Sequence, residues 1–498
     1  MLFLLLTTIF VRLSFGLHFS NVLGDNMVLQ RSPQQAVVWG FSSPFDVVTV
    51  NFNGFKDYTA ADLNGQFRMV LPPMEEGGPV DVLAMSTITG DQALLRNVMF
   101  GDVFFCSGQS NMEFTLGSGF NASEEIARAN LYPNIRLMTV GQRTASPTPL
   151  TELQTIEQEW SIASNESVGG EDWTYFSAVC WLFGRDIHDY LKGAVPIGLI
   201  STNWHGTPVQ DWCSSDALAK CNQTKCKHAT CNGVGADEGN SALYNSMIAP
   251  FLPMRALGAI WYQGEENVGT GPQFGEDYYA CQFPAMIEDW RDKFDLKDMY
   301  FGFVQLAAYK ENGGTPVAAL RSGQLAALEL PMVGMASAVD LGDLYSPLGS
   351  IHPRNKQTVA RRLAATAKAL IYKEILVHQG PMFAGAFAAN SSKISGSIDE
   401  TSVLISFDPD TLGSGLIMKK VCCPEDLDYK YCSGFQLQTA DQSWHNAMAM
   451  VYGDTVVVSS AMVEDQRVLG VRYGYGDWPV MTIFNKEGFP AIPFTYTL

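Results

Sequence analysis

One residue whose setting suits chemistry is Ser110. It lies in the segment FFCSGQSNMEF, residues 104–114, where an apolar run leads into Gly108, Gln109 and Ser110. The nucleophile elbow of α/β hydrolases has the pattern G-x-S-x-G, but Met112 stands where the second glycine would be. A serine in a loop is often only a turn residue, so the rest of the chain must show whether Ser110 is a nucleophile.

A serine nucleophile needs a base that accepts its proton, and the chain has seven histidines. Only His205 and His352 lie in segments that follow predicted strands of the central region, and a Gly/Pro-rich loop leads to His352. His352 precedes Pro353 and a helix-like segment that begins near Gln357, so its turn is rigid. Because general-base catalysis requires a fixed imidazole, we favour His352 and keep His205 as the alternative.

Acyl transfer also needs hydrogen-bond donors that face the developing oxyanion. The candidates are the backbone N–H groups of Ser110 and Gly206 and the side-chain amide of Asn267. Gly206 could instead be an ordinary turn glycine, and Asn267 could be a helix cap. The assignment of both residues as oxyanion donors is supported only if the fold brings them close to Ser110.

Aromatic and amide side chains lie beside the same segments. Trp204, Trp212 and Trp261 could stack on sugar rings, although burial in a core is the more common fate of tryptophan. We expect Trp204, together with Gln109 and Gln263, to contact the substrate.

An alternation of strand-like and helix-like segments, from about residue 99 to about residue 375, must position these residues. SAVCWLFGRDIHDYLK and KQTVARRLAATAKALIYKE have helical periodicity, and apolar runs lie between such segments. This alternation predicts βα units and a mostly parallel sheet. Ligands of such sheets bind beyond the carboxyl ends of the strands, so we expect the candidate residues to meet at one edge.

Short β-branched or alternating runs, separated by Gly, Pro and Asn turns, occupy both flanks of this region. The predicted organisation is a signal peptide at 1–16, an N-terminal β domain at 17–98, an α/β catalytic domain at 99–378 and a C-terminal β-sandwich-like domain at 379–498.

Composition and charge exclude several classes of protein. The 498 residues are 47% hydrophobic and 17% charged, which is typical of a globular protein of two or three domains. A formal net charge of −19 argues against nucleic acid or an anionic membrane surface as a partner. The sequence contains no HExxH, P-loop or dinucleotide fingerprint. We therefore expect no metal or organic cofactor, and we predict no obligate protein partner.

The N-terminal segment MLFLLLTTIFVRLSFG indicates a cleaved signal peptide, and its apolar run is too short to span a membrane. Four N-x-S/T sequons are consistent with secretion, at Asn121, Asn165, Asn222 and Asn390. We expect a mature protein of the secretory pathway, lysosomal or secreted, that does not associate with membranes.

The ten cysteines include two clusters. One cluster holds Cys213, Cys221, Cys226 and Cys231, and the other holds Cys422, Cys423 and Cys432. In an oxidising compartment these clusters predict loops closed by disulfides, whose pairing stays open. Zinc is the alternative for the first cluster with His228, but the spacing matches no common zinc site.

Several segments together resemble the SGNH-hydrolase superfamily and, within it, the sialate O-acetylesterase family. They are GDVFFCSGQSNMEF, NWHGTPVQDW, WYQGEENVG and GSIHPRNKQTVARRL, in the order and spacing of the family. The opening FSNVLGDNMVLQR and several C-terminal segments are also similar. The resemblance covers nearly the whole mature chain and implies an SGNH, flavodoxin-like central domain flanked by two β domains.

By this resemblance, Ser110 is the nucleophile, Gly206 and Asn267 complete the oxyanion hole, and His352 is the base. The implied reaction is hydrolysis of O-acetyl esters on sialic acids, which releases acetate. Two alternatives stay open: an esterase for other O-acetylated glycans such as acetyl-xylan, and a glycan-binding protein without turnover.

The chain departs from the superfamily at the acid that orients the catalytic histidine. Many members carry Asp three residues before that histidine, and here the position is Gly349. Glu265, which resembles the acid of related carbohydrate esterases, is our preferred substitute, with Asp340 and Asp343 as alternatives. A dyad in which a backbone carbonyl orients His352 is a further alternative. A second departure is His205, where many relatives have glycine.

Overall fold

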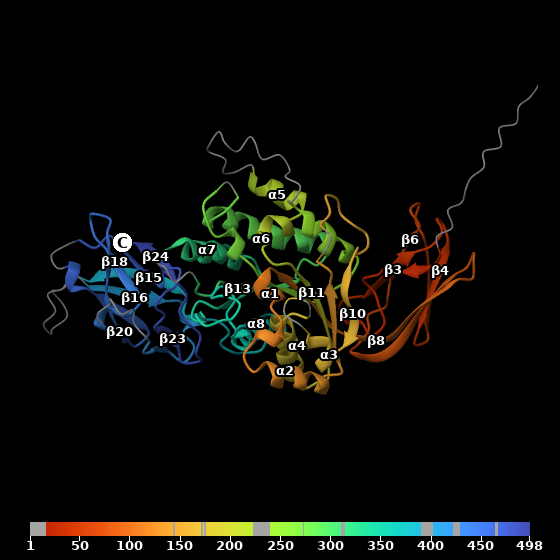
Figure 1. Cartoon of the computed structure of the whole chain (residues 1–498), viewed down its shortest axis with the longest axis horizontal. Coiled ribbons are helices and arrows are strands. Elements are labelled where there is room, and N and C mark those ends of the chain that lie inside the picture. The colour runs from red at the N-terminus through yellow and green to blue at the C-terminus, as the bar shows by residue number, and fades with distance from the viewer. Residues whose placement is uncertain are drawn as a thin grey trace, which may run out of the picture.

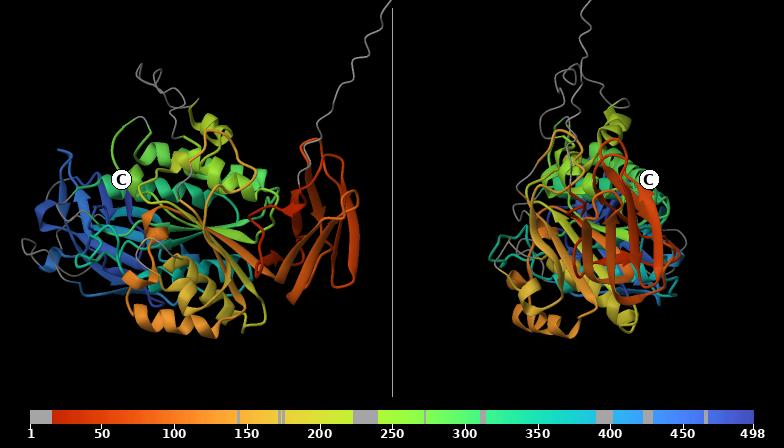
Figure 2. Two further views of the ribbon diagram at one scale, coloured as in Figure 1. Left: turned by 45° about the vertical axis from the view of Figure 1, so that its right-hand side comes forward. Right: turned by 90° about the vertical axis from the view of Figure 1, so that its right-hand side faces the viewer.

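A computed structural model of the chain describes residues 16–142, 145–170, 173, 176–222, 240–271, 273–309, 314–389, 402–421, 429–463 and 467–498. The described residues form three groups along the longest axis of the molecule (Figure 1). Strands of the N-terminal and C-terminal parts lie at the two ends, and a layered α/β part lies between them (Figure 2).

The middle part is built on a central sheet. Its strands lie in the order β10 (Ile156–Ile162), β9 (Ile135–Val140), β11 (Ile197–Asn203), β8 (Gln92–Gly108), β12 (Gly258–Tyr262), β13 (Tyr300–Gln305) and β14 (Val333–Ser337). All neighbouring pairs from β9 to β14 are parallel, and β10 is antiparallel to β9. Every residue of β9, β11, β12, β13 and β14 is buried, as expected for strands covered on both faces.

Helices cover both faces of this sheet. On one side α4 (Ala178–Tyr190) packs against α8 (Lys356–Leu370), which also contacts β13 and β14. On the other side α6 (Glu276–Lys293) contacts α5 (Ser215–Asn222) and α7 (Pro316–Gln324) (Figure 1). The chain therefore has an α/β fold, and α4 and α8 coincide with the two segments of helical periodicity.

Strand β8 joins the N-terminal part to the middle part. Its first half pairs with β7 (Gly77–Ser86) and β2 (Val28–Gln30), and its second half pairs with β11 and β12. The strand thus runs without interruption across the expected boundary at 98 and 99. One hydrophobic cluster extends from Leu17 through both parts, because the shared strand gives them a common core.

The remaining N-terminal strands form two antiparallel groups. One contains β1 (His18–Phe19), β3 (Val37–Phe41) and β6 (Gln66–Val70), and the other adds β4 (Val47–Phe52) and β5 (Phe55–Ala60) to β7. These strands carry the alternating runs of the sequence, and β4 alternates buried residues with more exposed ones.

The described residues of the C-terminal part form two four-stranded sheets and one strand pair. They are β15 (Phe383–Ala389), β16 (Ser402–Phe407), β21 (Thr455–Ser459) and β20 (Met448–Tyr452); β19 (Trp444–Asn446), β18 (Phe435–Gln438), β22 (Gly470–Tyr473) and β24 (Phe494–Thr497); and β17 (Leu416–Met418) with β23 (Ile483–Asn485). A second hydrophobic cluster, with Val403, Val456 and Tyr473, forms their core. This part of the chain therefore buries most of its apolar side chains separately from the middle part.

Two disulfides lie among the described residues. Cys106 of β8 is bonded to Cys180 of α4, and Cys221 of α5 is bonded to Cys281 of α6. The expectation that Cys213 closes a loop is wrong, because its thiol is free and fully buried. Cys432 is also disulfide-bonded, as expected for its cluster, and Cys226, His228, Cys231, Cys422 and Cys423 lie outside the described residues.

Two of the sequons are accessible. Asn121 and Asn165 are exposed, Asn222 is the last residue of α5, and Asn390 lies outside the described residues, as does most of the segment expected to be a signal peptide. Within the described ranges, no helix has the length and apolarity needed to cross a bilayer.

Candidate active site

Ser110 lies at the carboxyl end of β8, on the first residue of α1 (Ser110–Glu113). Gly108 has φ +142°, and a Cβ at this position would lie 2.2 Å from the carbonyl oxygen of Tyr262, so glycine is needed where β8 passes β12. The N–H of Ser110 has no acceptor within its helix, since it belongs to the first residue. Among the described residues, no hydrogen bond uses the Ser110 hydroxyl, which is therefore free to react.

The strands on both sides of β8 bring further segments to the same edge. Asn203 of β11 and Tyr262 of β12 are both in register with Gly108. The N–H of Trp204 donates to the Gly108 carbonyl at 3.0 Å. Strand β8 thus lies between the strand that precedes Gly206 and the strand that precedes Glu265. This edge, where the order of the strands reverses, is where open α/β sheets bind ligands.

Gly206 lies in the turn after β11, whose last residue is in register with Gly108 of β8. Its φ is +65°, and a Cβ placed on it would have no atom within 4 Å, so open space surrounds this turn. In the described part of the chain its N–H has no hydrogen-bond acceptor. An oxyanion could therefore approach this N–H together with that of Ser110.

Asn267, the third expected donor, is fully buried and engaged with protein atoms. Its Oδ1 accepts from the N–H of Val209 and from Nε2 of Gln263, each at 2.8 Å. Its Nδ2 donates to Oε1 of Gln210 at 3.0 Å. These bonds join the loops after β11 and β12, so in this structure Asn267 braces the loop of Gly206.

Gln109 and Gln263, which we expected to contact substrate, are also buried. Oε1 of Gln109 accepts from Nε2 of Gln263 at 3.1 Å and from the N–H groups of Gly264 and Glu266 at 3.3 and 3.2 Å. Nε2 of Gln263 also donates to the Thr207 carbonyl at 3.1 Å. The two side chains therefore lie beneath the site and bind its loops together.

The three tryptophans have different environments. Trp212 and Trp261 are fully buried and lie edge to face, with ring centroids 5.8 Å apart. They belong to the core, so the stacking role considered for them is wrong. Trp204 is half-buried at the loop of Gly206, and it alone of the three has a face that a sugar could contact.

His352 is half-buried, and a backbone carbonyl orients its ring. Nδ1 lies 2.8 Å from the carbonyl oxygen of Leu348. Because a carbonyl only accepts, Nδ1 carries the proton and Nε2 keeps its lone pair. The ring of Trp173 packs edge to face on His352 at 5.1 Å between centroids. Burial lowers the pKa of His352 below its ordinary 6.5, which favours the neutral base near pH 7.

The three carboxylates considered as the orienting acid have other partners. Oε1 of Glu265 accepts from Nδ2 of Asn111 at 2.5 Å. Asp340 is paired with Arg362, and Asp343 is paired with Arg354. None of the three forms a hydrogen bond or ion pair with His352 in the described structure. The preferred acid, Glu265, therefore does not reach the imidazole, and the Leu348 carbonyl occupies the place of the acid.

Asp343 instead closes the loop that carries His352. Its Oδ2 lies 2.6 Å from Nε of Arg354, its Oδ1 lies 2.9 Å from Nη2, and Oδ2 also accepts the Arg354 N–H at 3.2 Å. Leu348 lies within the loop that this ion pair closes. These hydrogen bonds from Arg354 also keep the pKa of the Asp343 carboxyl below its ordinary value.

We expect Asp343→Asn to lower kcat about tenfold with a smaller change in KM, because a looser loop misplaces the Leu348 carbonyl and the imidazole. Asp340→Asn is the matched control, since it weakens an Asp–Arg pair outside this loop. Steady-state kinetics and the melting temperature of both variants test the expectation. A larger loss of kcat in Asp340→Asn than in Asp343→Asn contradicts it.

His205, the alternative base, has a carboxylate partner. Oε2 of Glu113 accepts the N–H of His205 at 2.6 Å, and both carboxylate oxygens lie 3.2 Å from Nδ1. The His205 side chain is 62% exposed, whereas that of Glu113 is 2% exposed. Burial raises the pKa of Glu113, and the charge of His205 opposes that rise. His205 and Glu113 thus form a histidine–carboxylate pair on the loop after β11 and the helix that begins at Ser110.

Sequence reasoning missed Glu113 and Trp173. Glu113 lies one helical turn after Ser110, and that spacing was the available signal. Trp173 has φ +65°, rare for a residue with a side chain, and lies outside the segments that follow the strands. Its sequence position gives no indication of its contact with His352.

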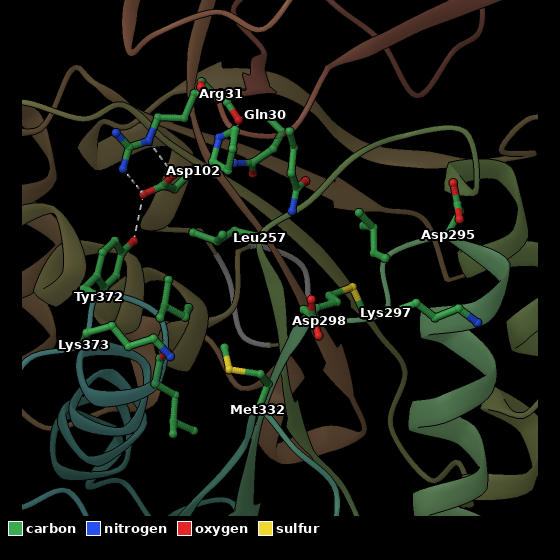
Figure 3. A pocket seen from close by; sticks show the side chains of 17 residues that line it. Gln30, Arg31, Asp102, Leu257, Asp295, Lys297, Asp298, Met332, Tyr372 and Lys373 are labelled. Carbon is green, nitrogen blue, oxygen red and sulfur yellow. Dashed lines mark hydrogen bonds and ion pairs between the residues drawn. The ribbon is translucent and has the colours of Figure 1, made fainter.

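A cavity of about 710 Å³ lies at the opposite, amino-terminal end of the sheet (Figure 3). Arg31 and Tyr372 both bond Asp102 there, with Nε of Arg31 and the hydroxyl of Tyr372 each 2.8 Å from a carboxylate oxygen. These residues connect the N-terminal part with the end of α8. The cavity is therefore separate from the Ser110 edge, and its charged lining is largely paired within the protein.

No group of three or more His, Cys, Asp or Glu side chains within the described ranges is arranged to hold a metal ion. The chemistry that the site offers comes from its own side chains. A hydroxyl and two backbone N–H groups without partners in the described structure, together with an oriented imidazole, are the parts of a serine hydrolase.

The comparisons with known proteins agree on one family. A family model described as carbohydrate esterase, sialic acid-specific acetylesterase, matches residues 100–369. The sialate O-acetylesterase of Homo sapiens is 38% identical over 391 residues, which cover 74% of this chain and 73% of that protein. That of Mus musculus is 37% identical over 417 residues, covering 74% and 76%. A solved carbohydrate acetylesterase from Xanthomonas citri has a TM-score of 0.80 and 30% identity, and the match covers 96% of this chain and 99% of that one.

Proposed function

The chain belongs to the carbohydrate esterase family of sialic acid-specific acetylesterases, and from that premise we propose how it removes O-acetyl groups from sialic acids. Ser110 is the nucleophile and His352 is the general base, carried by the α/β part at about residues 99–378. The observation that carries this proposal is the meeting, at the end of β8, of a free serine hydroxyl with the loops of Gly206 and His352.

In the first step the Ser110 hydroxyl oxygen attacks the acetyl carbonyl carbon, and Nε2 of His352 takes the hydroxyl proton. The tetrahedral oxyanion is stabilised by the N–H groups of Ser110 and Gly206. When the intermediate collapses, the bond from carbon to the sugar oxygen breaks. The sugar oxygen leaves with the proton from His352, and Ser110 remains acetylated.

In the second step water attacks the acetyl-serine carbonyl, and Nε2 of His352 takes a proton from that water. The bond to the Ser110 oxygen breaks, Ser110 regains its proton from His352, and acetate leaves. Nδ1 donates to the Leu348 carbonyl throughout, so the same nitrogen, Nε2, transfers the proton in both steps.

A substrate panel tests the proposed function. We expect acetate release from O-acetylated sialic acid to exceed release from acetyl-xylan by at least about tenfold in kcat/KM. A faster reaction with acetyl-xylan would indicate an esterase for other glycans. Binding of acetylated sialic acid without any acetate release would indicate a glycan-binding protein.

A further inference from the structure

Lys356 is a buried lysine that the mechanism above does not use. It is the first residue of α8 and is 1% exposed. Its Nζ donates to Oδ1 of Asn111 at 2.5 Å and lies 4.4 Å from the ring centroid of Phe114 and 5.3 Å from that of Tyr262. Burying an ammonium group is costly unless partners satisfy it, so these contacts indicate a specific role.

Asn111 connects Lys356 to two other parts of the site. Its Nδ2 donates to Oε1 of Glu265 at 2.5 Å and to the Ile351 carbonyl at 2.8 Å. The ammonium group of Lys356 can only donate, so it fixes the carbonyl end of the Asn111 amide, and Nδ2 must face the two acceptors. Asn111 follows Ser110 and Ile351 precedes His352, so one amide ties the serine turn to the histidine loop.

Glu265 supplies the opposite charge. It is 7% exposed, and its Oε2 has no hydrogen-bond partner in the described structure. Burial raises the pKa of Glu265, while Asn111 and Lys356 oppose that rise. Burial also lowers the pKa of the Lys356 amine to about 7, and the Glu265 carboxylate opposes that fall. The amide of Asn111 lies between these two buried groups and is polarised by both.

We propose that Lys356, Asn111 and Glu265 form a positioning bridge that holds the His352 loop in register with Ser110. The bridge rests on the hydrolysis proposed above and gives Glu265 a role other than a bond to His352. Lys356 acts through Asn111 and Ile351, so it is a positioning residue that does not touch the substrate.

The bridge also sets the charge around the base. The Lys356 ammonium lowers the pKa of His352, as does the charge of His205. The acidic groups that act on Lys356 are Glu265 and Asp343. Removing the charge of Lys356 therefore raises the pKa of His352. Because the base must be neutral, the acidic limb of the pH profile of kcat/KM then moves to higher pH.

The test compares Lys356→Met with Lys356→Gln in the full chain, on O-acetylated sialic acid. We expect Lys356→Met to lower kcat about 100-fold with little change in KM, since displacement of catalytic groups by about 1 Å has effects of that size. Lys356→Gln keeps a hydrogen-bond donor without the charge. We expect its kcat to be about tenfold higher than that of Lys356→Met. Both variants should shift the acidic limb upward.

Lys368→Met is the matched control, because it removes a lysine near the other end of the same helix, where Nζ lies over Tyr190. It should leave kcat and the pH profile unchanged. The bridge is overturned if Lys356→Gln keeps wild-type kcat and an unshifted acidic limb, whether or not its melting temperature falls. Should Lys356→Met not fold, Lys356→Gln alone decides. Failure of the proposed function is separate, because wild-type protein would then release no acetate.

Discussion

Replacing Ser110 with alanine is expected to lower kcat/KM for O-acetylated sialic acid by at least about 10⁴-fold, because no other group in the site can form the acetyl-enzyme. Substrate binding should change little, since the hydroxyl is one small group at the end of β8. Acetate release by purified protein measures the first effect. A residual rate from the backbone donors is expected even in this variant.

Ser107→Ala is the control for this experiment. Ser107 lies on the same strand, is fully buried and bonds the hydroxyl of Thr202, so its loss should affect stability by about 1 kcal/mol and activity far less. Mass spectrometry of wild-type protein quenched during turnover should place one acetyl group on the peptide of Ser110. Equal acetate release by wild type and Ser110→Ala would remove Ser110 from the mechanism.

The strand ends were predictable from sequence because parallel strands covered on both faces are continuous apolar runs. Such runs stop where polar loops begin, so Ser110 and Gly206 could be proposed as candidates without a structure, whereas His352 was proposed from its rigid turn in the loop that follows the last strand. The boundary at 98 and 99 was not predictable, because β8 continues through it as one uninterrupted strand. The two halves of β8 pair with different strands, and the local sequence does not show which strands will pair.

Side-chain orientation was the part of the site that sequence could not supply. Asn267 and Gln263 were identified by position, but their amides face protein atoms in a buried network. Glu265 likewise follows a strand as expected, but its carboxylate accepts a hydrogen bond from Asn111. Lys356 was not predicted because a lysine at the start of a helix is usually solvated. Here Asn111, Phe114 and Tyr262 surround its ammonium group.

The buried network of amides helps to hold the loops around Ser110, together with the apolar core beneath them. Gln109, Gln263 and Asn267 satisfy one another and the backbone of both neighbouring loops. A fully satisfied polar network is rigid, and losing any member leaves its partners unpaired in a low-dielectric environment. If the N–H groups of Ser110 and Gly206 bind the oxyanion as proposed, this rigidity preorganises them.

The choice between the two histidines has the second largest expected effect. We expect His352→Gln to lower kcat/KM about 10⁴-fold at pH 7 and His205→Gln to lower it less than about tenfold. The reason is geometric: Nδ1 of His352 donates to a carbonyl, which leaves Nε2 as a base, and burial keeps the pKa of this ring below 6.5. In wild type, kcat/KM should therefore rise with pH along a limb whose midpoint lies below pH 6.5.

His205 makes this comparison informative, because its ring has the carboxylate partner that His352 lacks. If Glu113 and His205 formed the catalytic pair, His205→Gln and Glu113→Gln would both lose more activity than His352→Gln. The acidic limb would also persist in His352→Gln. If His352 is the base, that limb disappears with His352 and survives in His205→Gln. The two histidine variants, measured across pH on one substrate, therefore decide which imidazole takes the proton of Ser110.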